Sequence, residues 1–483
     1  MNDIAKTIVS VSNKQRNRNE REKEKIMSKE KPVIGTEGIY DARTLGAPRM
    51  LVLGIQHMFA MFGATVLVPA LTGLSVSATL LFAGLGTLLF HLLTKRKVPA
   101  FLGSSFAFIG GYAAIAPMLE DPANPGVFNV PNTELLPYAC FGVLIAGLMY
   151  VILAACFKIF GMKKVMRFFP PIVVGPIIIC IGLTLSSSAI NNCNTNWLIA
   201  LLAIAVVIIC NIWGKGMIKI IPILLGFLVS YIVAAICGEV DFTPVKEAAW
   251  IGLPFHMQDT VIGLLSKPDL DTGLLVTSIF TIAPLSLATM VEHIGDICAI
   301  SSTCERNFIT DPGLHRTLLG DGLATSLAAL FGAPANTTYG ENTGVLALSK
   351  VYDPFVIRIA AVLAIVFSFC PKFAALIRIM PAATIGGVSM VLYGMISAVG
   401  VRNVVENKVD FTKSRNVIIA AIIMVLALGI SNSDAGCVTI GSVSLSGLAV
   451  ASIVGILLNA ILPGKDYEFG KDEQGDTSVN FKV

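Results

Sequence analysis

Apolar runs of about 18–25 residues recur along almost the whole chain, and they constrain the fold more than any other feature. A helix of that length crosses the roughly 30 Å hydrocarbon core of a bilayer. Hydrophobic residues make up 55% of the chain and charged residues only 14%, whereas soluble domains carry roughly 25% charged residues. The short alternating segments of a membrane β-barrel are absent from the sequence. The sequence therefore predicts an all-α polytopic membrane protein.

Fourteen transmembrane segments are predicted, at residues 48–70, 75–94, 101–118, 135–158, 170–188, 195–213, 217–237, 274–300, 316–333, 336–351, 354–376, 380–399, 414–431 and 440–462. Lys and Arg gather in alternate loops, and the intervening loops are acidic or rich in Asn. The positive-inside rule then places both tails in the cytosol of a multi-pass protein of the cytoplasmic (inner) membrane. Lys372 and Arg378 break this pattern, because they fall on the predicted outer side.

The rest of the composition narrows the class further. Residues 1–32 are polar and basic without an apolar core, so no cleavable signal peptide is expected. We expect this mixed-charge arm to be solvated, with a lipid-surface or regulatory contact as the alternative. The ten cysteines form no CxxC pair and are expected to be buried hydrophobes. The net charge of +4 follows from the basic loops, so no nucleic acid partner is predicted.

Two polar stretches interrupt the apolar pattern, at residues 103–108 and 334–344. Neither can face lipid, because each unsatisfied backbone group there costs several kcal/mol. Each stretch follows a polar pair of residues in an earlier predicted span, Gln56-His57 or Glu292-His293. The intervals are similar, 50 residues from Gln56 to Phe106 and 49 from Glu292 to Glu341. Seven spans in each half make the repeat inverted, and interrupted spans at matching positions point to a transporter's substrate site.

Three acidic residues in predicted spans, Glu292, Asp296 and Glu341, are candidate proton-coupling groups. Glu292 and Asp296 lie one helical turn apart, and two carboxylates that close cannot cheaply both be ionised in a low-dielectric site. At least one is therefore expected to bind and release a proton, and no cofactor is predicted beyond coupling protons. The alternative is that these carboxylates are structural. His57 and His293 are more commonly helix-packing residues, with site support or proton relay as the alternative, and their spacing predicts no metal site.

The two interrupted stretches suggest the kind of solute. Ser105 and residues 337–338 would present hydroxyls and backbone groups to a cavity, and the helices that follow would point their N-terminal dipoles inward. Carboxylates can accept from ring N–H groups, backbone N–H groups can donate to ring carbonyls, and Phe106 or Tyr339 can stack on a ring. This lining favours a flat, uncharged nucleobase-like solute over a sugar, an ion alone or an amino acid.

Four motifs resemble the nucleobase–ascorbate transporter family (nucleobase:cation symporter-2), and especially its bacterial uracil-type members. They are residues 56–69, 99–108, 292–296 and 336–344, and the resemblance spans roughly 48–462. The run 341–350 is similar to the family signature Gln/Glu-Asn-x-Gly-x4-Thr-Arg, with Ser349 and Lys350 at its last two positions. The resemblance implies a 7+7 inverted repeat with short antiparallel strands in spans 3 and 10, and an elevator-type movement of a core domain past a gate domain.

The implied division of the chain is an N-terminal tail (1–46), core (47–158), gate (159–238), an extracellular connection (239–273), core (274–378), gate (379–463) and a C-terminal tail (464–483). The resemblance implies that the side chains of Glu292 and Glu341 bind the substrate. It also implies that the backbone amides of Phe106 and Gly340 bind it. Three further positions match residues around that pocket: Tyr339 in its wall, Tyr393 on the gate domain and the bracing Asn342. A homodimer through the gate domains is also compatible with the resemblance.

The family resemblance leaves the choice of base open at one position. Asp296 is typical of purine-type members, which transport xanthine or urate, whereas Tyr-Gly-Glu-Asn at 339–342 is the uracil-type form. We expect a proton-coupled uracil symporter, with a xanthine or purine symporter as the alternative and Asp296 among the substrate-binding residues. An anion transporter of the related 7+7 fold is less consistent with buried carboxylates. A membrane enzyme would need a metal cluster or a nucleophile–base pair, and neither is visible in the sequence.

Overall fold

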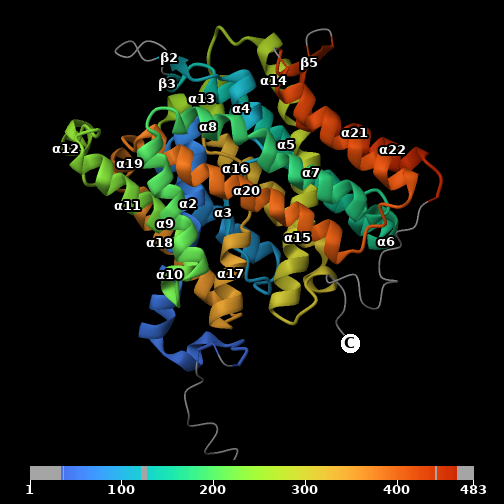
Figure 1. The fold of residues 1–483 in the computed structure, drawn as a ribbon, viewed down its shortest axis with the longest axis horizontal. Coiled ribbons are helices and arrows are strands. Elements are labelled where there is room, and N and C mark those ends of the chain that lie inside the picture. Colours follow the sequence, from blue (N-terminus) through green and yellow to red (C-terminus); the bar gives the residue numbers. More distant parts are fainter. Residues whose placement is uncertain (1–33, 36, 121–127, 434, 441–442, 465–483) are drawn as a thin grey trace, which may run out of the picture.

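The computed structural model describes residues 34–35, 37–120, 128–433, 435–440 and 443–464. Most of each predicted tail, 1–46 and 464–483, lies outside these residues, as do residues 121–127. Long helices fill the molecule, and the segment before α2 (Ala47–Thr72) lies at the end opposite α4 (Ile109–Ile115), α14 (Thr272–Ile282) and β5 (Cys437–Ile440) (Figure 1).

The first half of the chain contains eight main helices and one buried strand. In chain order they are α2 (Ala47–Thr72), α3 (Val76–Leu93), β1 (Leu102–Ser104), α4 (Ile109–Ile115), α5 (Leu136–Phe160), α7 (Pro171–Thr184), α8 (Ser186–Cys193), α9 (Trp197–Ile212) and α11 (Pro222–Ile236). Short elements complete it: η1 (Ala42–Leu45), β2 (Leu119–Glu120), β3 (Phe128–Val130), α6 (Met162–Met166), α10 (Met217–Ile220) and α12 (Thr243–Glu247).

The second half repeats this order with a second buried strand. It contains η2 (Met257–Asp259), α13 (Val261–Leu265), α14 (Thr272–Ile282), α15 (Leu285–Thr303), η3 (Ile309–Gly313), α16 (Leu314–Leu330), β4 (Asn336–Thr338), α17 (Gly340–Ser349), α18 (Pro354–Ser368), α19 (Pro371–Arg378), α20 (Ala382–Glu406), α21 (Ser414–Ser431), β5 (Cys437–Ile440), β6 (Val443–Ser446) and α22 (Gly447–Ile461). Each predicted span therefore has a helix or a strand–helix unit.

Helix packing shows the repeat directly. Helix α5 of the first half packs along α16 of the second. The repeat makes α18 the counterpart of α5 and α3 the counterpart of α16, and α18 also packs extensively on α3. Likewise, α9 packs on α11, and its counterpart α21 packs on α22. In addition, α9 packs on α20 of the second half, and α21 packs on α7 of the first half. One set of helices (α2–α5 and α14–α18) and another (α7–α11 and α20–α22) make their largest contacts within themselves.

Length and composition support fewer crossings than predicted. Seven described helices are long and apolar enough to span a bilayer, or eight if the bent pair α18–α19 counts as one span. Three shorter apolar helices are α9, α11 and α22. The protein is mostly helical and passes through the membrane several times, but these criteria do not confirm the number fourteen.

The predicted span 354–376 is not one straight helix. Helix α18 ends at Ser368, and α19 starts at Pro371 after a bend of 87°. Proline lacks the N–H that would continue a helix, so it fits the first turn of a new one. Lys372 and Arg378 both lie on α19, and the Lys372 ammonium is 4.9 Å from the centre of the Trp250 ring. Because α19 bends away from α18, Lys372 and Arg378 do not lie in a simple loop between two spans. The positive-inside rule therefore does not apply to them directly.

Two other boundaries also differ from the predictions. Helix α22 begins at Gly447, because residues 437–440 and 443–446 form the antiparallel strands β5 and β6 ahead of it. The N-terminal tail does not extend to residue 46, since Ile39 forms a parallel bridge with Val351, just after α17. The Ile39 N–H donates to the Lys350 carbonyl at 2.7 Å, and the Tyr352 N–H donates to the Ile39 carbonyl at 2.8 Å.

The two short strands predicted in spans 3 and 10 pair as expected. Strands β1 and β4 are antiparallel, with Gly103 opposite Thr337, and all six of their residues are buried. Extended backbone at this depth is tolerated only inside protein. The pair therefore sits within the helices of the first set, and it positions the candidate site.

Candidate substrate site

Hydrogen bonds to the neighbouring helices α2 and α3 hold strand β1 in place. The Leu102 N–H donates to the Thr87 hydroxyl at 2.9 Å, and the Ser104 hydroxyl donates to the Thr65 carbonyl at 2.9 Å. Such partners are needed because no water reaches these groups in the bilayer core. Strand β1 is thus fixed to both α2 and α3.

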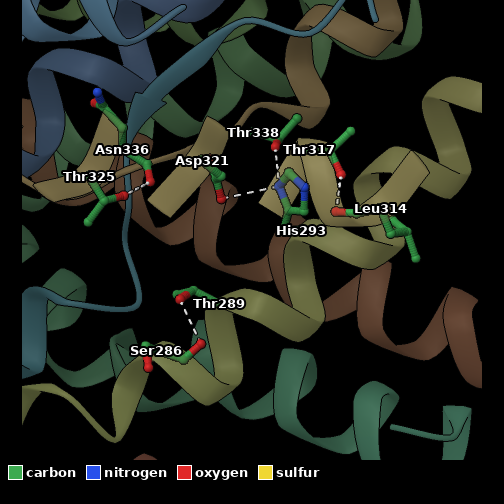
Figure 2. Close-up of polar contacts among 9 residues, drawn as sticks. All are labelled: Ser286, Thr289, His293, Leu314, Thr317, Asp321, Thr325, Asn336 and Thr338. Atoms are coloured by element: carbon green, nitrogen blue, oxygen red, sulfur yellow. Dashed lines mark hydrogen bonds and ion pairs between the residues drawn. The ribbon is translucent and has the colours of Figure 1, made fainter. Parts of the chain in front are cut away.

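Strand β4 is fixed in the same way from the other side. The Asn336 side-chain amide donates to the Phe82 carbonyl of α3 at 2.9 Å. The Thr325 hydroxyl of α16 donates to the Asn336 carbonyl at 2.7 Å (Figure 2). The helix that begins at Gly340 therefore starts from a rigid base.

Tyr339 joins the two strands. Its hydroxyl donates to the Ser104 carbonyl at 2.9 Å, and its N–H donates to the Phe101 carbonyl at 3.0 Å. A Cβ at Gly103 would collide with the Tyr339 ring, so this close approach requires glycine. The side chain is only 4% exposed. Tyr339 thus lies beside the predicted pocket, and most of its contacts are with the strands.

Two backbone amides at the helix starts have no partner among the described residues, those of Phe106 and Gly340. Gly340 is the first residue of α17, where helix N–H groups lack intrahelical acceptors. An added Cβ at Gly340 would meet nothing within 4 Å, so its backbone borders open space. Both amides are available as donors, which is what the predicted contacts with a base carbonyl require.

The three predicted carboxylates are brought together. Glu292 and Asp296 lie on α15, Glu341 lies in the first turn of α17, and α15 packs against α17. Glu292 interacts electrostatically with Glu341, and Asp296 interacts with both. All three are partly exposed, whereas the adjoining His293 and Asn342 are buried. None of the three forms an ion pair with Lys or Arg among the described residues.

A fourth acid, Asp321 of α16, was missed by the sequence analysis. It is fully buried, and its Oδ2 atom lies 3.1 Å from the Nδ1 atom of His293, which is also fully buried (Figure 2). Its charge acts on both Glu292 and Asp296. The cue was an aspartate between two glycines within the predicted span 316–333. Because the surrounding run is apolar on average, the single acid did not interrupt the pattern.

His293 links three elements. Its Nδ1 atom lies 2.8 Å from the Thr338 hydroxyl of β4, in addition to the contact with Asp321 of α16 (Figure 2). Both groups contact the same buried ring nitrogen, and these contacts fix the orientation of the ring. Since Glu292 precedes it on α15, this orientation also fixes the backbone that carries Glu292.

His57 and Asn342 form a second link. The Asn342 side-chain amide donates to the His57 carbonyl of α2 at 3.1 Å and lies 3.2 Å from the His57 Nδ1 atom. Asn342 therefore ties the start of α17 to α2. Ser105, another predicted support, is fully buried and donates its N–H to the Ala335 carbonyl at 2.8 Å, while its hydroxyl has no partner among the described residues.

Tyr393 on α20 meets the first half of the site. Its ring lies edge-on to the Phe106 ring, with centroids 6.1 Å apart. This contact joins the two helix sets. Within the described residues no group of three or more His, Cys, Asp or Glu side chains could hold a metal ion. The arrangement offers carboxylate acceptors, free amide donors and aromatic surface, which is suited to binding rather than to covalent chemistry.

Comparison with solved structures gives the fold. The transmembrane domain of the cyanobacterial bicarbonate transporter BicA matches with a TM-score of 0.55 at 15% identity, covering 88% of this chain and 99% of that domain. SLC26A9 matches with a TM-score of 0.60 at 12% identity, covering 85% of this chain and 64% of the other. These proteins have the 7+7 inverted-repeat fold, so the predicted fold class is confirmed, whereas the exact number of fourteen spans is not. Such low identity carries no information about the solute.

Sequence relatives are much closer. The uracil permease of Bacillus caldolyticus is 40% identical, covering 90% of this chain and 96% of its own. The uracil permease of Bacillus subtilis is 39% identical, covering 95% and 100%, and the putative pyrimidine permease RutG of Escherichia coli is 35% identical, covering 86% and 89%. The model of the Permease family matches residues 48–436. The chain therefore belongs to the Permease family, a family of transporters rather than enzymes, and its resemblance to the nucleobase–ascorbate transporters is confirmed.

Proposed function

We propose that this protein imports uracil with protons across the cytoplasmic membrane, with both termini in the cytosol. The main support is the grouping of Glu292 and Glu341, on two different elements, beside the unpartnered amides of Phe106 and Gly340. Carboxylates accept from the two ring N–H groups of uracil, and amides donate to its carbonyls. Relatives that are 35–40% identical are named uracil or pyrimidine permeases.

Proton coupling follows from the charge balance of this cluster. Four acids, Glu292, Asp296, Glu341 and Asp321, interact electrostatically, and His293 is the partner of only one of them. Ionising several carboxylates together in a low-dielectric region is costly. We propose that one of Glu292, Asp296 and Glu341 takes up a proton before the base binds tightly, which makes the loaded site more nearly neutral for transfer.

The movement we propose is that of an elevator. Helices α2–α5 with α14–α18 would carry the site past α7–α11 with α20–α22, since each set makes its largest contacts within itself. The contact between Phe106 and Tyr393 lies at the boundary between the sets. A homodimer through the second set would hold it still, and we expect crosslinking in native membranes to detect such a dimer.

Uptake of labelled uracil by proteoliposomes tests the proposal, with and without an imposed inward proton gradient. We expect uptake that rises with the gradient and is competed by excess unlabelled uracil. Uptake that ignores the gradient would reject the coupling. Xanthine as a better competitor than uracil would instead support the purine-type alternative, for which Asp296 is the motivating residue. Competition by sulfate or bicarbonate would point to an anion transporter.

A further inference from the structure

A cavity of about 180 Å³ opens beside the candidate site without reaching its carboxylates. It is bordered by the start of α4, the end of α7 and the break between α14 and α15. The other side is formed by Ser431 at the end of α21, by Gly436 and Cys437, and by Ser446 and Leu448 at the start of α22. Figure 1 shows α4, α14 and β5 at one end of the molecule, opposite the segment that precedes α2. In the orientation proposed above, this end faces outward.

Among the described residues, the lining of this cavity carries no Asp, Glu, Lys, Arg or His side chain. The polar side chains there are hydroxyls and the Cys437 thiol, and the Thr281 hydroxyl is buried without a hydrogen-bond partner within the described part of the chain. Thr184 donates its hydroxyl to the Cys180 carbonyl at 2.9 Å, which leaves its oxygen free to accept. A charged ligand would lack a counter-charge here, whereas an uncharged one with donors and acceptors would satisfy these groups.

Size and position narrow the ligand further. The cavity volume of about 180 Å³ is many times the roughly 10–15 Å³ that one water needs by the same measure, so it has room for a single small ring. Phe106 forms part of the cavity wall. Phe106 also carries one of the two unpartnered amides of the candidate site, so the cavity and that site are adjacent.

We propose that this cavity is an entry subsite, which holds an uncharged heterocyclic base weakly before it passes to the carboxylates. The inference rests on the proposed function, because the base is the solute to be carried. The subsite selects against ions because its described lining carries no charged side chain. It raises the local concentration of base beside Phe106 and so speeds loading of the deeper site.

Two neighbouring alanines on α4 provide the first test. Ala113 and Ala114 are both exposed, but only Ala114 lines the cavity. Ala114→Phe fills the cavity, and we expect it to slow uracil association about tenfold, within the range seen among variants of one site. The equilibrium affinity of purified protein should change far less, and Ala113→Phe should resemble wild type in both. Equal association rates in the two variants would overturn the proposal.

Cys437 provides the second test, because its thiol lines the cavity. Maleimide labelling of Cys437 is followed by mass spectrometry of its peptide, so the other cysteines do not interfere. Millimolar uracil should slow this labelling even in Glu341→Gln, which lacks the deeper site, but not in Ala114→Phe. Protection that disappears in Glu341→Gln, or is absent from every variant, would overturn the subsite. Failure of wild type to bind or carry uracil would instead reject the proposed function itself.

Discussion

The link between His293 and strand β4 gives a sharp prediction, because β4 carries a matched control. Thr338 and Thr337 are adjacent and buried, and valine has nearly the same shape as threonine. The Thr338 hydroxyl lies 2.8 Å from the His293 Nδ1 atom, whereas the Thr337 hydroxyl has no partner among the described residues. Replacing each by valine therefore separates the loss of a hydrogen bond from the loss of a hydroxyl.

The expected magnitudes follow from these contacts. Removing one partner of a buried hydrogen bond costs about 1–3 kcal/mol. Since Asp321 Oδ2 remains 3.1 Å from His293 Nδ1, we expect Thr338→Val to cost about 1 kcal/mol, the lower end of that range. Thr337→Val removes an unsatisfied buried hydroxyl and should stabilise the protein by about 1 kcal/mol. The two variants should then differ by about 2 kcal/mol, roughly thirtyfold in the unfolding equilibrium.

Titration with SDS in mixed micelles, followed by tryptophan fluorescence, measures the free energy of unfolding of both variants beside wild type. Uracil affinity of the same samples shows whether the orientation of His293 reaches the site. We expect weaker binding only in Thr338→Val. Equal destabilisation of the two variants, or a larger loss in Thr337→Val, would refute the idea that the Thr338 hydroxyl fixes His293.

Three further substitutions test the site. Glu341→Gln should abolish or redirect uracil binding while the protein remains in the membrane, and wild-type affinity by equilibrium dialysis would remove Glu341 from the site. Asp296→His should shift competition in uptake assays toward uracil, and unchanged inhibition by xanthine would deny a selective role. Gly103→Ala should cost about 1–3 kcal/mol of unfolding free energy, because its methyl group meets the Tyr339 ring, whereas Gly110→Ala places a methyl group in open space. Similar losses in both would contradict this.

Much of the architecture could be predicted because the bilayer simplifies the pattern. The apolar runs predicted the positions of the helices. The polar run at 334–344 predicted an interruption, and the structure has strand β4 and the start of helix α17 there. The pairing of β1 with β4 came only from the family resemblance, since three-residue strands have no periodicity of their own. The roles of Glu292, Glu341 and Asp296 stay predictions, although the structure places the three together.

The missed features depend on distant contacts or on single residues. Asp321 was masked by the apolar average of its span, and its partner His293 is 28 positions away in the chain. The bend before Pro371 was signalled by that proline, but the hydropathy of the following residues concealed it. The hairpin at 437–446 alternates apolar and polar residues, a strand pattern that a search for helical spans passes over.

The bridge between Ile39 and Val351 has a practical consequence for handling this protein. The segment before α2 is bonded to the residues that end α17, the helix on which Glu341 stands. Tyr40 strengthens the attachment, since its hydroxyl donates to the Cys304 carbonyl at 3.0 Å. A purification tag or fluorescent protein fused immediately before Ile39 would disturb the hydrogen bonds between Ile39 and residues 350–352. Fusions are better placed at the far terminus, or upstream with a spacer that leaves the attachment undisturbed.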